Sequence, residues 1–262
     1  MAQPRETGKP FLRGSITDEK TPRAALSFLG GLLIMALLNL ILTATFVAIG
    51  AYWLRVFFCL AEVLIYCAIA FYSGLNRGTA AVSLGEIAWN REQAGKEVTP
   101  RERRLCWHPL KGLCTAVLGS LPALIAALLY AFSATRQTFS PGVLPEWVSG
   151  MVSRPDVLTP LTAYTESVPA GFTDVLRVIV RALVMPFIGI AGSDHFDAVL
   201  LVDRLSPLLV LLPALSYGAG WLMGPRGRSR VHASIGEGEK KRRRREQRER
   251  QNRARRQPNQ LN

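Results

Sequence analysis

The sequence has few of the residues that build metal centres, since its 262 residues include four cysteines and three histidines. The cysteines show no Cys-x-x-Cys spacing, and the group Cys106, His108 and Cys114 would still need a fourth ligand to form a zinc site. We therefore expect no metal, no other cofactor and four free thiols, at Cys59, Cys67, Cys106 and Cys114.

Signatures of catalysis and nucleotide binding are also lacking. The glycines between 74 and 95 are not preceded by a strand and followed by a helix, as a phosphate-binding loop requires. Asp194, His195 and Asp197 form an acid–base grouping, but a surface loop of this composition is usually only solvated. We therefore expect a protein that is not an enzyme.

Long apolar stretches, in contrast, are abundant. Four of them approach or exceed the roughly 20 residues that a helix needs to cross a bilayer, and each contains at most one ionisable group. The sequence therefore predicts an all-α, polytopic membrane helix bundle with four transmembrane helices. The apolar stretches cover residues 24–53, 56–75, 112–134 and 205–223.

Basic residues gather outside these stretches and indicate the orientation. Five Lys and Arg lie in residues 1–23, seven in 76–111 and fourteen in 226–262. Because such residues resist translocation, the pattern places both termini and the first long loop in the cytoplasm. The compact loops and the lack of a recognisable targeting signal favour a cell membrane, namely the plasma membrane of a bacterium.

The predicted organisation follows from these boundaries. Arg55 would lie in the tight turn of the first hairpin, and a short helix over 82–93 would sit in a loop interrupted by glycines. The segments are a cytoplasmic N-terminus (1–23), a first transmembrane hairpin (24–75), a cytoplasmic loop (76–111), a third transmembrane helix (112–134), an extracytoplasmic segment (135–204), a last transmembrane helix (205–223) and a basic cytoplasmic tail (224–262).

The extracytoplasmic segment contains an amphipathic helix over 174–185. Asp174, Arg177 and Arg181 recur at i, i+3 and i+7 and so share one helical face, while apolar residues cover the others. If residues 174–192 crossed the membrane, the number of spans would be odd and the basic tail would lie outside. We therefore expect an interfacial or re-entrant helix, ended or kinked at Pro186.

Two polar residues lie within the apolar stretches and are the candidate binding residues. Glu62 needs a partner or a proton at that depth, and Arg55, Arg177 and Arg181 are its candidate partners. Such a pair could pin the amphipathic helix to the bundle, which is the favoured interpretation, or Glu62 could belong to a proton or cation site. Asn39 is expected to hydrogen-bond between helices.

The tail over residues 226–262 combines fourteen basic residues with four glutamates. Without a periodic apolar face it should form either a disordered segment or a single polar helix. It also contains no aromatic residue on which bases could stack, so its contacts with anionic lipid, RNA or an acidic protein would be electrostatic. The residues expected to make these contacts are Lys240, Lys241, Arg242, Arg243, Arg244, Arg245, Arg248 and Arg250.

Two functions remain open on this basis. The first is a non-enzymatic membrane scaffold or accessory protein whose tail binds anionic lipid, RNA or an acidic partner. The second is a small transporter or transporter subunit that uses Glu62 and helices kinked by Pro122, Pro207 and Pro213. Because four spans are few for a carrier, the second function would require a homo-oligomer or a membrane-protein partner.

Overall fold

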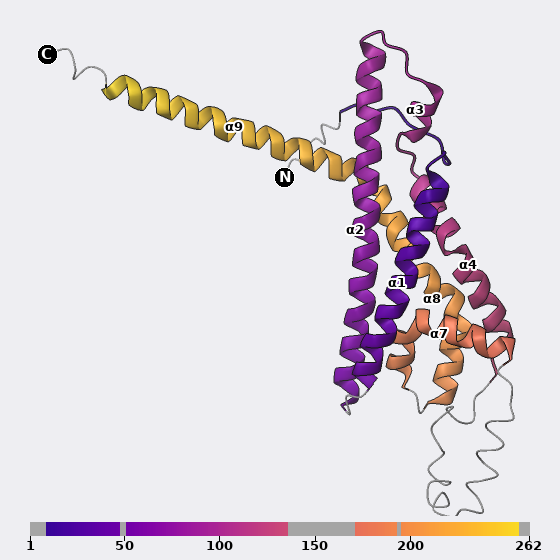
Figure 1. Ribbon diagram of the computed structural model, residues 1–262. Coiled ribbons are helices and arrows are strands. Elements are labelled where there is room, and N and C mark those ends of the chain that lie inside the picture. Colours follow the sequence, from indigo (N-terminus) through magenta and orange to yellow (C-terminus); the bar gives the residue numbers. More distant parts are fainter. Residues whose placement is uncertain (1–8, 48–50, 136–170, 193–194, 257–262) are drawn as a thin grey trace, which may run out of the picture.

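The computed structural model describes residues 9–47, 51–135, 171–192 and 195–256, and within them every regular element is an α-helix. Figure 1 shows the long helices side by side, with α9 leaving the bundle sideways. The helices are α1 (Thr21–Val47), α2 (Tyr52–Gln93), α3 (Pro100–Leu105), α4 (Lys111–Ser133), α7 (Phe172–Ala191), α8 (Phe196–Leu222) and α9 (Gly224–Arg256).

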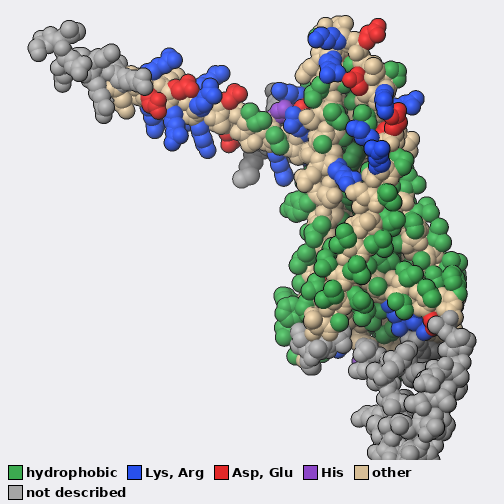
Figure 2. Space-filling model, viewed as in Figure 1, with side chains coloured by type: hydrophobic (Ala, Val, Ile, Leu, Met, Phe, Trp, Pro, Cys, Tyr) green, Lys and Arg blue, Asp and Glu red, His purple; other side chains and the backbone are tan. Residues whose placement is uncertain are grey.

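Four of these helices, α1, α2, α4 and α8, are long and apolar enough to cross a membrane. Their outward surfaces carry large apolar side chains, such as Leu37 and Leu64, each more than 60% exposed. In Figure 2 these apolar side chains cover one end of the bundle, whereas charged side chains gather mainly at the other. The prediction of an all-α bundle with four candidate transmembrane helices is confirmed for the described residues.

Helix α8 lies between α2 and α4, and glycines allow the close approach of α2. A Cβ atom on Gly74 would collide with the backbone carbonyl of Tyr217, and one on Gly220 would collide with that of Phe71. Small residues let helix backbones approach in this way in membranes, where packing replaces the hydrophobic effect as the main attraction. The α2–α8 contact is therefore sterically intolerant of side chains at these positions.

Helix α2 runs without interruption to Gln93, which corrects the prediction of a glycine-broken loop with a separate helix over 82–93. Its 42 residues correspond to about 63 Å, roughly twice the thickness of a bilayer core. Gly78 and Gly85 do not interrupt it, because each lies where another segment packs closely, at Trp221 and at Leu12. Gly95, which has a φ of 72°, lies just beyond its end.

The ends of two other elements also differ from the predictions. Arg55 lies in the first turn of α2 rather than in a turn between helices. Helix α8 begins at Phe196, nine residues before the predicted boundary, and so includes Asp203 and Arg204. A buried ion pair explains why Asp203 can lie inside this helix, as described below.

Helix α7 extends over Phe172–Ala191, longer than the predicted 174–185, and continues past Pro186. It is not one of the four described helices that are long and apolar enough to cross a membrane, and Figure 1 shows it lying across the end of the bundle. Leu176, Val180 and Val184 are buried against α4 and α8, whereas Val178 is 70% exposed. This amphipathic helix thus closes the end of the bundle opposite α3.

Residues 9–20 and 94–110 form a folded cap around the protruding end of α2. The Leu12 amide donates to the Gly85 carbonyl, and the Gly14 amide donates to the Trp107 carbonyl. The Trp107 indole in turn donates to the carbonyl of Trp221 at 3.2 Å. Because these bonds connect the N-terminal segment, α2 and the end of α8, this end of the molecule is ordered by tertiary contacts.

Candidate functional site

Glu62 lies in a small polar cluster inside the membrane-spanning part, with 7% of its surface exposed. The Thr43 hydroxyl donates to Glu62 Oε2 at 3.2 Å. With its amide nitrogen turned toward the carboxylate, Asn39 donates to Glu62 Oε1 at 3.1 Å and to the Met35 carbonyl at the same distance. The expectation that Asn39 bonds between helices is therefore met, and its partner is Glu62.

The cluster borders a cavity of about 20 Å³, enough for about one water molecule. Its walls come from α1, α2, α7 and α8, and they include Tyr66, Pro186 and Pro213. Helix α7 approaches this region closely, because a Cβ on Gly189 would lie 2.7 Å from Cys59 Sγ. Glu62 thus lies where four helices meet, beside a cavity with room for about one water molecule.

The three arginines proposed as partners of Glu62 are placed elsewhere. None of the described basic side chains forms an ion pair with Glu62. Arg177 binds Asp174 one turn earlier on α7, with 2.9 Å between Nη1 and Oδ1. Arg55 lies over the ring of Tyr52, with 5.4 Å between its guanidinium carbon and the ring centroid.

Arg181 makes the ion pair that joins α7 to the bundle, and its partner is Asp203. Its Nη2 lies 2.7 Å from Asp203 Oδ2, and its Nε donates to Oδ1 at 3.2 Å, so the contact is bidentate. The Tyr130 hydroxyl donates to Asp203 Oδ2 at 2.9 Å and brings α4 into the same network. A structural pair that pins the amphipathic helix does exist, but Asp203 takes the place predicted for Glu62.

Sequence reasoning missed Asp203 because residues up to 204 were assigned to an extracytoplasmic segment. A signal was present, since Asp203 lies four residues before Pro207 and is followed by an apolar run that continues to Met223. Extending the helix backwards by two turns would have placed a carboxylate inside it. A carboxylate in that environment requires a cation, and in the structure Arg181 supplies it.

Helix α9 is attached to the charged end of the bundle by a second network, centred on Glu86 of α2. Arg228 Nε donates to Glu86 Oε2 at 3.0 Å, and His232 Nε2 lies 2.9 Å from Glu86 Oε1. Next to this network, a Cβ on Gly224 would collide with the backbone of Gly78. Helix α9 therefore begins about one turn beyond Leu75, where the apolar stretch ends, and stays in contact with α2 as far as Glu86.

The charges of α9 are distributed unequally around its axis. Arg228 and His232 define the face turned toward Glu86, and steps of four and seven residues place Glu239, Arg243, Glu246 and Arg250 on the same side. As far as Arg250, the opposite face carries one acidic residue, Glu237, among five basic ones. These five are Arg226, Arg230, Lys241, Arg244 and Arg248.

Figure 2 shows where these charges point. Lys and Arg side chains project from the edge of α9 that is turned toward the apolar end of the bundle, and others project from the opposite edge. The predicted tail residues from Lys240 to Arg250 all lie within this helix and are exposed. Of the two forms left open for the tail, the structure has the single polar helix over the described residues, as far as Arg256.

The residues considered for metal binding and catalysis are not assembled into a centre. All four cysteines are free thiols, and in the described part of the chain no three His, Cys, Asp or Glu side chains are placed to hold a metal ion. Asp194 of the acid–base grouping lies outside the described residues. The expectations about enzymatic activity and cofactors stay predictions.

The fold and these networks define a multi-pass membrane protein with a basic helical arm. Comparisons of the chain with protein-family models, with curated proteins and with solved structures found no match. The functional argument therefore depends on the geometry of the chain itself.

Proposed function

We propose that the protein is a membrane-anchored scaffold whose helix α9 lies along the anionic surface of the cytoplasmic leaflet. The observation that carries the proposal is the way α9 leaves the bundle. It starts about one turn beyond Leu75 and extends sideways rather than onward along α2. In the proposed orientation, this is the level at which the lipid headgroups begin. Glu86 supports this direction through its bonds to Arg228 and His232.

The distribution of charge on α9 also supports binding to the anionic membrane surface. The face of α9 opposite Glu86 carries five basic residues and one glutamate, and basic side chains project toward the apolar end of the bundle. A Lys or Arg near an anionic membrane contributes about 1 kcal/mol, and the effect fades within a Debye length of about 8 Å. An arm held parallel to the surface can therefore bring several charges within range at once.

RNA is the less favoured ligand for the same arm. Residues 226–262 contain no Phe, Tyr or Trp, so bases would have no platform for stacking. In the proposed orientation, with both termini cytoplasmic in a bacterial plasma membrane, the predominantly basic face is also turned toward the lipid. An acidic protein would have to compete with the membrane for that face.

Two triple variants test the proposal at equal net charge. The first replaces Lys241, Arg244 and Arg248 with Gln, and the control replaces Arg242, Arg243 and Arg250 on the other side of the helix. Hydrogen exchange of α9 would be compared in nanodiscs of phosphatidylcholine alone and with one third phosphatidylglycerol. We expect phosphatidylglycerol to protect α9 in the natural chain and in the control, and much less in the first variant.

Equal protection in both variants, or none in the natural chain, would reject the lipid-bound arm. Binding of RNA or of an acidic protein that is unaffected by phosphatidylglycerol would assign the arm to that partner instead. Raising the salt concentration provides a second measurement, since protection that depends on exposed charges must decline as they are screened.

One observation favours the second candidate, a transporter or transporter subunit. Glu62 is buried beside Pro186 and Pro213, with Thr43 and Asn39 as hydrogen-bond donors and a cavity for about one water molecule. Prolines release backbone carbonyls in helices that line such sites, which suits a proton or a small cation rather than a larger solute. The test is proton-driven uptake in proteoliposomes, with Glu92→Gln as the exposed control. Uptake that persists in Glu62→Gln would reject this role.

A further inference from the structure

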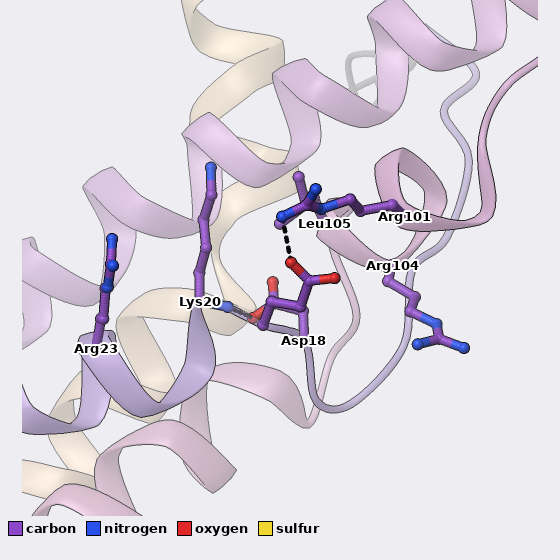
Figure 3. A pocket seen from close by; sticks show the side chains of 7 residues that line it. Asp18, Lys20, Arg23, Arg101, Arg104 and Leu105 are labelled. Atoms are coloured by element: carbon purple, nitrogen blue, oxygen red, sulfur yellow. Dashed lines mark hydrogen bonds and ion pairs between the residues drawn. The ribbon is translucent and has the colours of Figure 1, made fainter.

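A cavity of about 230 Å³ lies at the charged end of the bundle, between the start of α1 and α3. Figure 3 shows Lys20 and Arg23 extending toward the same side, with Arg101 turned toward a neighbouring carboxylate and Arg104 on the other side of Asp18. This cavity is separate from Glu62 and from helix α9. Its lining consists of Asp18, Glu19, Lys20, Arg23, Arg101, Arg104 and Leu105.

The two carboxylates of the cavity already have cationic partners. Asp18 is 2.7 Å from Lys111 Nζ in a buried ion pair, and Glu19 is 2.5 Å from Arg101 Nη2. Among the described residues, no carboxylate pairs with Lys20, Arg23 or Arg104. The cavity therefore has a surplus of positive charge, which a phosphate group would complement.

An apolar groove of about 510 Å³ begins at the same place and follows α1 and α4 into the membrane-spanning part. Asp18 lines both hollows, so the basic cavity and the groove lie next to each other. The groove is formed along the first turns of α1 and the middle of α4, at the depth of acyl chains. Its apolar and small residues include Ala25, Leu26, Leu29, Leu118, Gly119 and Pro122.

We propose that these two hollows together bind one anionic phospholipid. Lys20 and Arg23 hold the phosphodiester, Arg104 adds to the positive potential, and an acyl chain lies in the groove between α1 and α4. Basic pockets between transmembrane helices on the cytoplasmic side are suited to anionic headgroups, because charge and an apolar neighbour are offered together. The groove selects a lipid over a free phosphate, since a soluble anion would leave it uncovered.

The inference does not depend on α9, since none of the residues that carry it belongs to that helix. The proposal that α9 binds the membrane surface can therefore be rejected without rejecting this site, and this site can be rejected without rejecting that proposal. Variants of α9 and variants of the cavity report on the two proposals separately.

Native mass spectrometry of the full chain, released from nanodiscs of mixed phosphatidylglycerol and phosphatidylcholine, tests the site. The variant Lys20→Gln/Arg23→Gln removes the phosphate ligands, and Lys9→Gln/Arg13→Gln is the matched control, because those exposed residues do not line the cavity. We expect one tightly retained phosphatidylglycerol per chain. The first variant should retain about tenfold less of it, and the control should retain as much as the natural chain.

The groove has its own pair of variants on α4. Leu118→Trp fills it, whereas Leu128→Trp places the same side chain on an exposed position outside it. We expect lower retention of phosphatidylglycerol only for Leu118→Trp. Two outcomes would overturn the phospholipid site: retention of phosphatidylcholine equal to that of phosphatidylglycerol, or an equal loss of lipid in a variant and its matched control. Displacement of the lipid by millimolar inorganic phosphate would also overturn it, because the cavity would then be assigned to a soluble anion.

Discussion

Lys111 at the start of α4 forms an ion pair with Asp18, which precedes α1, at 2.7 Å between Nζ and Oδ2. The exposed fractions of the two side chains are only 7% and 6%. Lys111 Nζ also donates to the Arg104 carbonyl at 2.9 Å, and the Thr21 hydroxyl donates to Asp18. These bonds join the N-terminal segment to the start of α1, α3 and α4.

Breaking this ion pair should destabilise the charged end of the bundle. Lys111→Met leaves the Asp18 carboxylate buried without its cation, and we expect a loss of about 3 kcal/mol in the free energy of unfolding. The double variant with Asp18→Asn should recover part of that loss, because no unpaired charge then remains. Thermal unfolding in detergent measures both, and equal stability of the natural chain and Lys111→Met would contradict the assignment.

The same carboxylate should make stability depend on pH. Burial by itself would raise the pKa of Asp18, but the hydrogen bonds from Lys111 and Thr21 outweigh it and hold the pKa below its ordinary value of 3.8. The stabilisation is therefore present above pH 3.8 and is lost as the pH falls through the folded-state pKa. We expect the difference in melting temperature between the natural chain and Asp18→Asn to be constant near neutral pH and to shrink in acid.

Adding a methyl group at the α2–α8 contact should be unfavourable. A Cβ on Gly74 would collide with the Tyr217 carbonyl, so Gly74→Ala must separate two helix backbones, and we expect a loss of about 1–3 kcal/mol. Gly30→Ala in α1 is the control, because no atom lies within 4 Å of its Cβ position. The control should be neutral or more stable by up to about 1 kcal/mol, since alanine favours helices.

Removing the charge of Asp203 should release α7 from the bundle. Asp203→Asn leaves Arg181 without its bidentate partner, and we expect a loss of about 3 kcal/mol, against about 1 kcal/mol for Tyr130→Phe. Asp174→Asn breaks a more exposed pair on α7 and should cost less than about 1 kcal/mol. Hydrogen exchange of α7 provides the local measurement, and unchanged exchange in Asp203→Asn would show that other contacts hold this helix.

The Glu86 network should determine how firmly α9 is held. Glu86→Ala removes the acceptor for both Arg228 and His232, so the amides of residues 228–236 should exchange faster than in the natural chain. Glu92→Ala changes an exposed carboxylate on the same helix and should leave their exchange unchanged. If both variants exchange alike, the glycine contacts near Gly78 are sufficient to hold α9.

Much of the fold was predictable because apolar length is a local property. A run such as 112–134 must form a helix in a membrane, whose interior offers no other partner for backbone groups. The glycines of α2 illustrate what was not predictable. Locally, Gly74, Gly78 and Gly85 weaken a helix, and only the segments packed against them explain why α2 continues to Gln93.

The candidate site was predictable in part, for a similar reason. Glu62 and Asn39 were recognisable because a polar residue in an apolar run needs a partner. Their mutual hydrogen bond was not, since it joins α1 to α2 at a register that periodicity alone leaves open. Glu86 gave no signal at all, because a glutamate in a polar segment is ordinarily solvated, and its partners lie more than 140 residues away.

The sequence by itself determined that this protein is a helical membrane bundle with a basic end, because hydrophobicity and charge act on each segment independently of its neighbours. Tertiary structure alone decided the pairings: Arg181 with Asp203, Asp18 with Lys111, and Glu86 with Arg228. It also decided that α9 leaves the bundle sideways. The physical reason is that a buried charge accepts whichever partner the helix packing brings within 3 Å, and the packing depends on contacts between residues far apart in the chain.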